Sequence, residues 1–186
     1  MTDITSATIA ILATDGFEKS ELFEPRRQLG EAGANVVIVS PGKSEIRSWD
    51  KDDWGESIAV DRQLADVSPE DFDALVLPGG QINPDVLRAD KDAVSFVKAF
   101  FDTGKTLAAI CHAPWLLVEA DVIRDREVTS FHSIRRDVEN AGGLWRDEPV
   151  VCDRAVVTSR NPGDLDAFCA KIIEEIREGR HKRKAA

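Results

Sequence analysis

Short apolar runs alternate along this chain with longer segments in which apolar residues recur at helical spacing. The short runs have strand length, and they occupy residues 7–14, 35–40, 74–80 and 106–110, with a hairpin-like pair at 150–160. The helical patterns occupy residues 21–33, 92–104, 113–120 and 164–179. Strands this apolar, separated by helices, are typical of a mostly parallel sheet that is covered on both faces.

The pattern therefore predicts one α/β sandwich domain over residues 1–176, followed by a basic tail at 177–186. Residues 43–72 fit neither pattern, and we expect a partly extended excursion there that contains a short strand, ESIAV. Internal repeats, low-complexity segments and linkers are not evident in the sequence.

Composition and charge indicate which partners and which cellular compartment suit this chain. The chain has 186 residues, of which 42% are hydrophobic, and its formal net charge is −10. That charge disfavours nucleic acid and anionic membranes as partners. We expect no membrane span and no signal peptide, because the apolar runs are short and the N-terminus lacks a basic region. Three cysteines without a CxxC pair argue against a disulfide scaffold or a zinc site, and they favour the cytoplasm.

The tail REGRHKRKAA runs against the acidic balance, with five Lys or Arg residues. Such a basic arm could contact an acidic partner. A solvated tail that complements the dipole of the last helix is the simpler interpretation.

Four segments with polar or reactive residues directly follow the expected strands. They are DGFEKSE, PGGQINPD, CHAPW and SRNPGD. In open α/β sheets, ligands bind outside the carboxyl ends of the strands. The sequence therefore predicts a functional site at this edge of the sheet before any chemistry is assigned.

Cys111 is the most reactive residue at this edge. It stands between the strand TLAAI and the helical segment APWLLVEA. At such a turn the backbone N–H groups and the helix dipole should favour a thiolate, and a nucleophile elbow would expose the sulfur. The alternative is that Cys111 is a small apolar residue that packs in the core.

Two neighbours of Cys111 have competing interpretations. His112 could take the thiol proton, or it could be a hydrogen-bonded structural residue, since adjacency alone does not make a dyad. Glu18 lies just after the first strand and could hydrogen-bond the sulfur, but its negative charge would raise the pKa of the thiol. It therefore assists Cys111 only if the carboxyl is protonated or if other groups outweigh the repulsion. Otherwise Glu18 belongs to the acidic start of the first helix.

Five segments resemble, in order and spacing, the PfpI-type intracellular cysteine peptidase family. They are DGFEKSEL, FDALVLPGGQINPDVLR, AAICHAPWLL, TSFHSIRRDVENAGGLW and VVTSRNPGDLDAF. This family belongs to the superfamily of the parkinsonism-associated deglycase and the class I glutamine amidotransferase domains. The resemblance implies a flavodoxin-like three-layer sandwich with a mostly parallel central sheet and a cysteine nucleophile elbow.

The resemblance also implies roles for individual residues. Cys111 matches the nucleophile, His112 the histidine that follows it, and Glu18 the protonated glutamate beside the sulfur. Asp85 matches an acid that a neighbouring subunit contributes, which implies a homo-oligomer, at least a dimer. The expected oxyanion and substrate residues are Gly79, Gly80, His132 and Arg160, although an ion pair is the simpler role for Arg160. We expect Cys152 and Cys169 to be core residues.

The family implies a cysteine-dependent stress-response hydrolase or lyase. Its activities are deglycase or glyoxalase chemistry on 2-oxoaldehydes, or on their adducts with proteins and peptides, and peptide hydrolysis. We favour small aldehydes, because a cysteine under an interface admits them more easily than a polypeptide. Oxidative sensing through Cys111 is a further alternative, and chaperone-like binding and glutamine amidotransfer have less support. We expect no cofactor and no metal site, since the sequence shows neither ligand spacing nor a phosphate-binding glycine pattern.

Overall fold

A seven-stranded sheet forms the centre of the molecule, which we describe from a computed structural model over residues 3–180. Its strand order is β11-β12-β8-β7-β1-β3-β6, and every pair is parallel except β11–β12. The strands are β1 (Thr8–Leu12), β3 (Asn35–Ser40), β6 (Arg62–Gln63), β7 (Ala74–Leu77), β8 (Thr106–Ile110), β11 (Val150–Asp153) and β12 (Val156–Ser159). All residues of β7 and β8 are buried, as expected for parallel strands that are covered on both faces.

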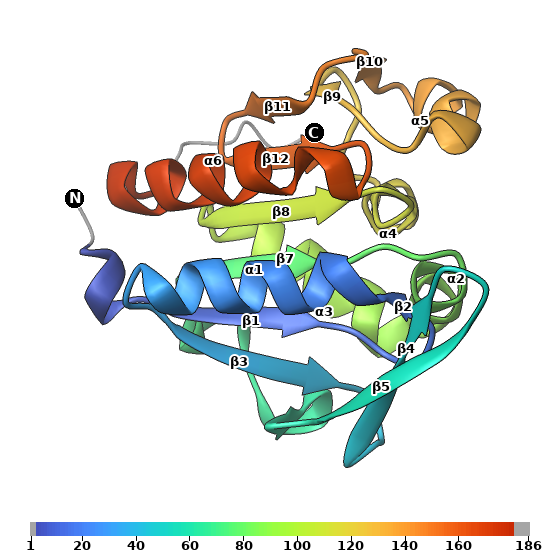
Figure 1. The fold of residues 1–186 in the computed structure, drawn as a ribbon. Helices are drawn as coiled ribbons and strands as arrows, with labels where there is room; N and C mark the ends of the chain where they lie inside the picture. Colours follow the sequence, from blue (N-terminus) through green and yellow to red (C-terminus); the bar gives the residue numbers. More distant parts are fainter. Residues whose placement is uncertain (1–2, 181–186) are drawn as a thin grey trace.

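Helices cover both faces of this sheet (Figure 1). One face carries α1 (Lys19–Glu31) and α6 (Leu165–Glu178), and the other carries α2 (Ile82–Ala89), α3 (Lys91–Asp102) and α4 (Pro114–Glu119). The side chains of β1 alternate between the two layers: Ile9 and Ile11 join the α1/α6 core, and Ala10 and Leu12 join the α3/α4 core. The predicted three-layer sandwich is therefore confirmed.

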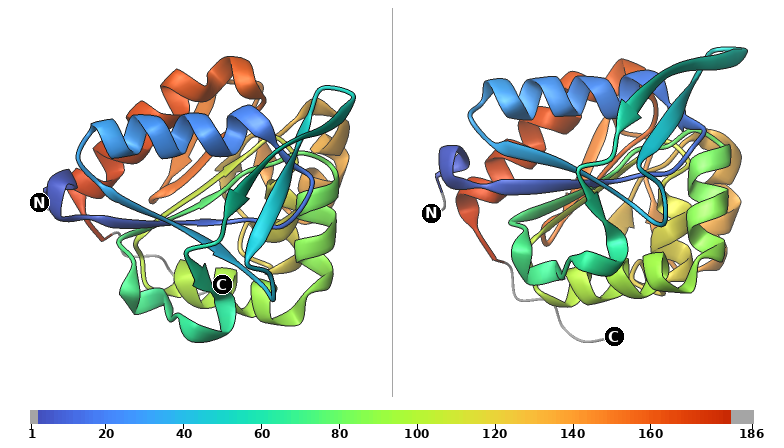
Figure 2. Two further views of the ribbon diagram at one scale, coloured as in Figure 1. Left: turned by 60° about the horizontal axis from the view of Figure 1, so that its bottom comes forward. Right: turned by 90° about the horizontal axis from the view of Figure 1, so that it is seen from below.

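Smaller elements surround the carboxyl ends of the strands. A second sheet consists of β2 (Phe17–Glu18), β4 (Glu45–Asp50) and β5 (Asp53–Ala59), and its β4–β5 hairpin projects from the body (Figure 2). A third pairs β9 (Glu127–Val128) with β10 (Leu144–Trp145), beside α5 (Arg135–Asn140). Short 3-10 helices occupy Ile4–Ser6, Leu64–Asp66, Pro69–Asp71, His132–Ile134 and Pro162–Asp164.

The predicted strands and helices are confirmed within about three residues at each end. The segment ESIAV lies in an extended hairpin, as expected, although this hairpin is longer than the sequence indicated. Helix α2 was not predicted, because GGQINPDVLR reads as a loop that contains an Asn-Pro pair.

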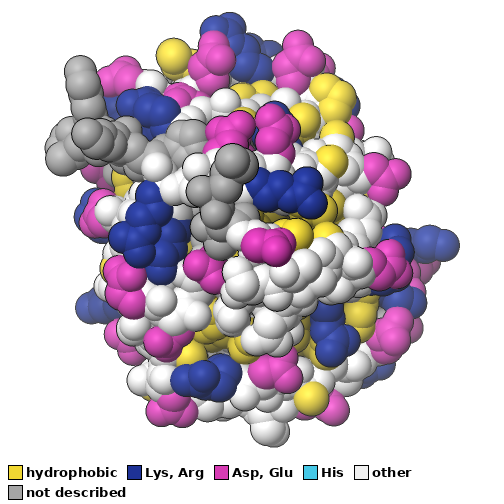
Figure 3. Space-filling view, turned by 90° about the vertical axis from the view of Figure 1, so that its left-hand side faces the viewer, with side chains coloured by type: hydrophobic (Ala, Val, Ile, Leu, Met, Phe, Trp, Pro, Cys, Tyr) yellow, Lys and Arg dark blue, Asp and Glu magenta, His cyan; other side chains and the backbone are white. Residues whose placement is uncertain are grey.

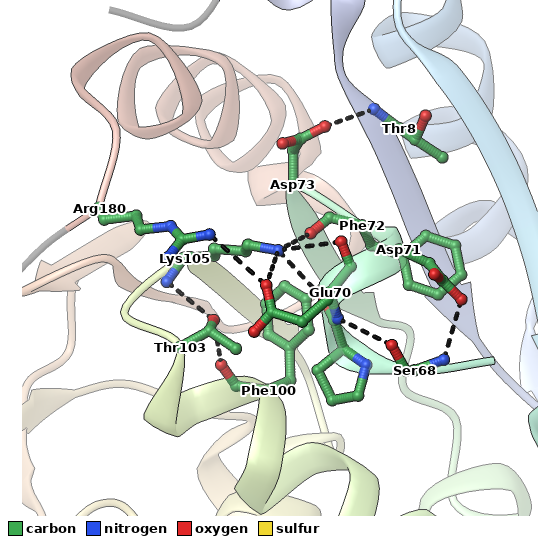
Figure 4. A network of polar contacts seen from close by, with 11 residues as sticks. Thr8, Ser68, Glu70, Asp71, Phe72, Asp73, Phe100, Thr103, Lys105 and Arg180 are labelled. Carbon is green, nitrogen blue, oxygen red and sulfur yellow. Dashed lines mark hydrogen bonds and ion pairs between the residues drawn. The ribbon is translucent and has the colours of Figure 1, made fainter.

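The opposite edge of the sheet is held by a polar network around Lys105 (Figure 4). Its buried Nζ donates to the carbonyls of Phe72 at 2.7 Å and Pro69 at 3.2 Å, and it lies 3.3 Å from Glu70 Oε2. Asp73 accepts a hydrogen bond from the backbone N–H of Thr8 at 2.9 Å. These contacts join the loop before β7 to the starts of β1 and β8, so the network is structural.

The surface at this edge mixes charges of both signs (Figure 3). Of the basic tail, Arg177 lies in the last turn of α6 and Arg180 lies 3.5 Å from Glu70, while residues 181–186 lie outside the described residues. Every helix within residues 3–180 is too short or too polar to cross a bilayer.

Candidate active site

Cys111 occupies a sharp turn between β8 and α4, and its backbone adopts a left-handed conformation with φ of 63°. Such a conformation is rare for a residue with a side chain, so the predicted elbow is present. Two hydrogen bonds hold it: Cys111 N–H donates to Ser159 O at 3.0 Å, and Phe131 N–H donates to Cys111 O at 2.8 Å. The carboxyl ends of β8 and β12 thus fix the position of the sulfur.

Glu21, on the first turn of α1, supplies the carboxyl group beside the sulfur. Its side chain is fully buried, and Oε2 accepts the backbone N–H of Gly79 at 2.8 Å. Burial, reinforced by the charge of Glu18, raises the pKa of Glu21 to about 8, although hydrogen bonds from Gly79 and Cys111 oppose the shift. The Glu21 carboxyl is therefore mostly protonated at neutral pH and can share a hydrogen bond with the thiol.

The prediction that Glu18 contacts the sulfur is therefore wrong. Glu18 is the N-cap of α1, and its Oε2 accepts from Glu21 N–H at 2.8 Å and from Ser20 Oγ at 2.5 Å. The helix begins at Lys19, earlier than the periodicity indicated, so the residue that points under the elbow is Glu21. The spacing Glu18-x-x-Glu21 resembles a capping box and was the signal in the sequence.

The expected thiolate at Cys111 is also not supported. Burial and the neighbouring Glu21 raise the pKa of the thiol well above its usual range, against the lowering effect of the Gly80 and His112 backbone N–H groups. Helix α4 is short and begins only at Pro114, so its dipole adds little. The sulfur therefore rests as a thiol and needs a base before it can attack.

His112 is placed to be that base. Its Nδ1 lies 3.1 Å from Cys111 Sγ, and its Nε2 lies 3.2 Å from Ser133 Oγ. The ring stacks on Phe131 at 4.8 Å between centroids and meets the edge of Trp115 at 5.3 Å. Burial lowers the pKa of His112, with a smaller contribution from His132, so the imidazole is neutral at pH 7 and can accept a proton.

The predicted oxyanion glycines have different roles. The Gly80 N–H lies close to both the Glu21 carboxyl and the Cys111 sulfur. Gly80 has φ of 80°, and a Cβ there would lie 2.6 Å from Gly16 O, so glycine is required. The N–H of Gly79, in contrast, is bound to Glu21 and supports that residue instead of a substrate oxygen.

Asp85 lies outside this cluster in the described chain. It is on the first turn of α2 with an exposed side chain, 3.5 Å from Arg88 Nε. The Arg88 guanidinium lies over the Trp115 ring at 4.9 Å, and Trp115 in turn contacts His112. Within residues 3–180, Asp85 is thus linked to the imidazole only through Arg88 and Trp115, and no hydrogen bond joins it to His112.

His132 and Arg160 line a separate cavity of about 310 Å³ next to Phe131. The Arg160 guanidinium is already paired with Asp164 at 2.9 Å and Asp147 at 2.8 Å, and these carboxylates raise its pKa. The ion pairs expected of Arg160 are therefore present. The exposed His132 ring packs on Phe131 at 4.3 Å.

The other two cysteines differ from Cys111. Cys169 is fully buried, as predicted, and Cys152 is partly buried. Burial raises the pKa of each to about 12. Within residues 3–180, His, Cys, Asp and Glu side chains form no cluster of three or more that could bind a metal ion.

Sequence comparisons show which known proteins this chain is similar to. A model of the DJ-1/PfpI family matches residues 7–175. "Protein/nucleic acid deglycase 2" of Escherichia coli is 44% identical over 88% of this chain and 94% of its own length. "Deglycase TK1284" of Thermococcus kodakarensis is 40% identical over 91% and 99%. "Putative cysteine protease YraA" of Bacillus subtilis is 41% identical over 88% and 94%.

Solved structures share the fold. The DJ-1/ThiJ/PfpI-like and ferritin-like two-domain protein of Anabaena variabilis matches with a TM-score of 0.85 and 33% identity, over 92% of this chain and 48% of that one. DJ-1beta of Drosophila melanogaster matches with a TM-score of 0.82 and 27% identity, over 93% of this chain and 95% of that one.

Proposed function

The chain belongs to the DJ-1/PfpI family, and from this premise we propose that it is a cysteine-dependent enzyme that acts on 2-oxoaldehydes and on their adducts with proteins. The observation that carries the proposal is the contact of Cys111 Sγ with His112 Nδ1 at 3.1 Å, on a strained turn beside a protonated carboxyl. Relatives named deglycases, at 40% and 44% identity, support the substrate class.

The first step forms the nucleophile. His112 Nδ1 takes the thiol proton, and the sulfur adds to the aldehyde carbon to give a hemithioacetal. The backbone N–H groups of Gly80 and His112 lie near the sulfur and are placed to stabilise the oxygen anion that forms.

The second step moves a proton between carbons. The proton on the former aldehyde carbon leaves and the neighbouring carbonyl oxygen takes up a proton, which gives an enediol. Protonation of the neighbouring carbon and loss of the hydroxyl proton at the sulfur-bearing carbon then give a thioester of the 2-hydroxy acid. Water then hydrolyses the thioester, releasing the acid and restoring the thiol. An adduct on an amine follows the same course once the amine departs. The net reaction is an internal redox of the substrate plus one water, so no external oxidant or reductant is consumed.

The assembly is part of the proposal. Asp85 of a second copy would approach His112 across an interface that α2 forms. The apolar side chains Ile82 and Val86, on the same helix as Asp85, are 38% and 50% exposed, which supports a contact surface there. The three cysteines are free, which suits a reducing compartment such as the cytoplasm.

Two other functions remain in competition. Peptide hydrolysis uses the same cysteine and histidine, and the relative named as a protease supports it. Oxidative sensing has less support, because the raised pKa of Cys111 reduces the thiolate that peroxide attacks.

The test is turnover of methylglyoxal, followed by its loss and by formation of lactate. We expect Cys111→Ser to reduce the rate at least a thousandfold, because the nucleophile is removed. Cys152→Ser is the matched control and should keep wild-type activity. A Cys111→Ser variant with full turnover would exclude the mechanism. Inactivity of both wild type and variant, together with cleavage of a peptide library by wild type alone, would favour the peptidase.

A further inference from the structure

We propose that Ser133 is a positioning residue for His112: its hydroxyl holds Nε2 of the imidazole so that Nδ1 faces the Cys111 sulfur. The inference rests on the proposed function, because it concerns the same cysteine and histidine. It adds a residue within the chain itself that supports the general base.

The backbone places Ser133 against the imidazole. Ser133 is the middle residue of the 3-10 helix His132–Ile134, which begins directly after Phe131. Phe131 N–H donates to Cys111 O at 2.8 Å, and Ile134 N–H donates to Phe131 O at 3.2 Å. The short helix is therefore fastened to the elbow itself, and its position relative to the sulfur is fixed by main-chain hydrogen bonds.

The surroundings of the imidazole leave its nitrogens few partners. Phe131 stacks on one face of the ring and Trp115 packs beside it, and the residue His112 is only 4% exposed. Its Nδ1 contacts Cys111 Sγ, and its Nε2 contacts Ser133 Oγ. Because an unpaired N–H in such a site is costly, the hydroxyl matters more here than it would in water.

The chemistry makes the hydroxyl most important after proton transfer. When the thiol proton moves from Sγ to Nδ1, the ring becomes a cation that carries a hydrogen on both nitrogens. Nδ1–H then faces the thiolate, and Nε2–H donates to Ser133 Oγ. Ser133 is exposed, so its own hydrogen can turn toward solvent. The hydroxyl therefore stabilises the thiolate–imidazolium pair relative to the thiol–imidazole pair.

The experiment measures the rate at which iodoacetamide alkylates Cys111 in the full chain between pH 5 and 10, with the modified peptide quantified by mass spectrometry. Ser133→Thr and Ser133→Val are the matched variants, because they have nearly the same shape and differ in the hydroxyl. We expect the Thr variant to follow wild type. The Val variant should react about tenfold more slowly at neutral pH, with its profile displaced to higher pH, since a hydrogen bond to a charged group is lost.

Ser6→Ala is the remote control, because Ser6 is an exposed serine in another 3-10 helix, and it should leave the profile unchanged. Superimposable profiles for the Thr and Val variants would overturn the proposal. Alkylation requires no substrate, so its outcome is independent of turnover. A wild type that is alkylated faster than the Ser133→Val variant but consumes no methylglyoxal would refute the proposed function and leave the role of Ser133 standing.

Discussion

Glu21 is the residue whose charge depends most directly on the fold. Its carboxyl is fully buried, and burial raises its pKa from 4.5 to about 8. Between these two pH values the folded protein keeps a proton that the unfolded chain releases. The contribution of Glu21 to the free energy of unfolding is therefore fully present below about pH 4.5, and it is lost as the pH rises through about 8.

Replacement of Glu21 tests this linkage. We expect the stability of the wild type to fall relative to that of Glu21→Gln by roughly 1 kcal/mol per pH unit between pH 5 and 8, since one proton is involved. Gln is neutral at every pH and can still accept the Gly79 N–H. Urea unfolding of both proteins across this range gives the measurement.

Wild type must be compared with Glu21→Gln because titration of His112 changes the stability with pH in the opposite direction. Burial lowers its pKa, so its contribution makes the folded state more stable as pH rises through the range in which the unfolded histidine titrates. The difference between wild type and Glu21→Gln removes this shared contribution. A difference that stays constant from pH 5 to 8 would show that Glu21 is ionised in the folded state throughout.

At the scale of elements, one helical turn decided which glutamate reaches the sulfur. Periodicity predicted that the first helix exists, but not that it begins at Lys19. Helix ends are set by capping contacts and by the preceding chain, which periodicity does not contain. The strands were predictable because each is a continuous apolar run, whereas α2 was not, because Asn83-Pro84 in its first turn resembles a loop.

The PGG segment after β7 is the element that joins Glu21 to the elbow. A Cβ at Gly79 would lie 2.5 Å from Glu21 Oε2, 2.7 Å from Cys111 Cβ and 2.8 Å from Ile110 O. The backbone fixes the positions of Cys111 Cβ and Ile110 O, so neither atom can turn away from the added methyl group. We expect Gly79→Ala to destabilise the protein by roughly 2–4 kcal/mol and to reduce turnover strongly, because the overpacked site must shift.

Gly30 provides the control for this substitution. It lies inside α1, and a Cβ there would meet nothing within 4 Å. Gly30→Ala should therefore stabilise the protein by about 0.5–1 kcal/mol and leave turnover unchanged, since alanine is the better helix former. Thermal unfolding and methylglyoxal assays on the two variants separate the effect of overpacking at Gly79 from the general effect of replacing glycine with alanine. Equal stability of the two variants would show that the segment can move aside.

For the whole molecule, the order of the strands is what gathers the site. Cys111 follows β8, the PGG segment follows β7 and Glu21 lies after β1, and these three strands are neighbours in the sheet. Alternation of strands and helices predicted this edge, because parallel strands end on the same side. Side-chain contacts such as those of Ser133 with His112 depend on the packing of short irregular segments, which have no periodic signal in the sequence.

If Asp85 of a second copy completes the active site, two inactive variants should restore activity when they form a dimer with each other. Asp85→Ala retains Cys111 but offers no acid to its partner, and Cys111→Ser retains Asp85 but has no nucleophile. In a symmetric dimer each chain completes the other's site. We expect each variant alone to be nearly inactive. An equal mixture, unfolded and refolded together, should regain roughly one quarter of wild-type activity, because half of the dimers are mixed and each has one complete site.

Two outcomes would contradict this arrangement, and they differ in meaning. If Asp85→Ala alone keeps full activity, the imidazole needs no acid from a partner, and the polar contact that Ser133 makes with it within the chain is sufficient. If Asp85→Ala is inactive and the mixture stays inactive although co-purification of differently tagged chains shows mixed oligomers, Asp85 acts within its own chain, through Arg88 and Trp115 toward His112. Recovery in the mixture requires that the acid and the nucleophile come from different chains.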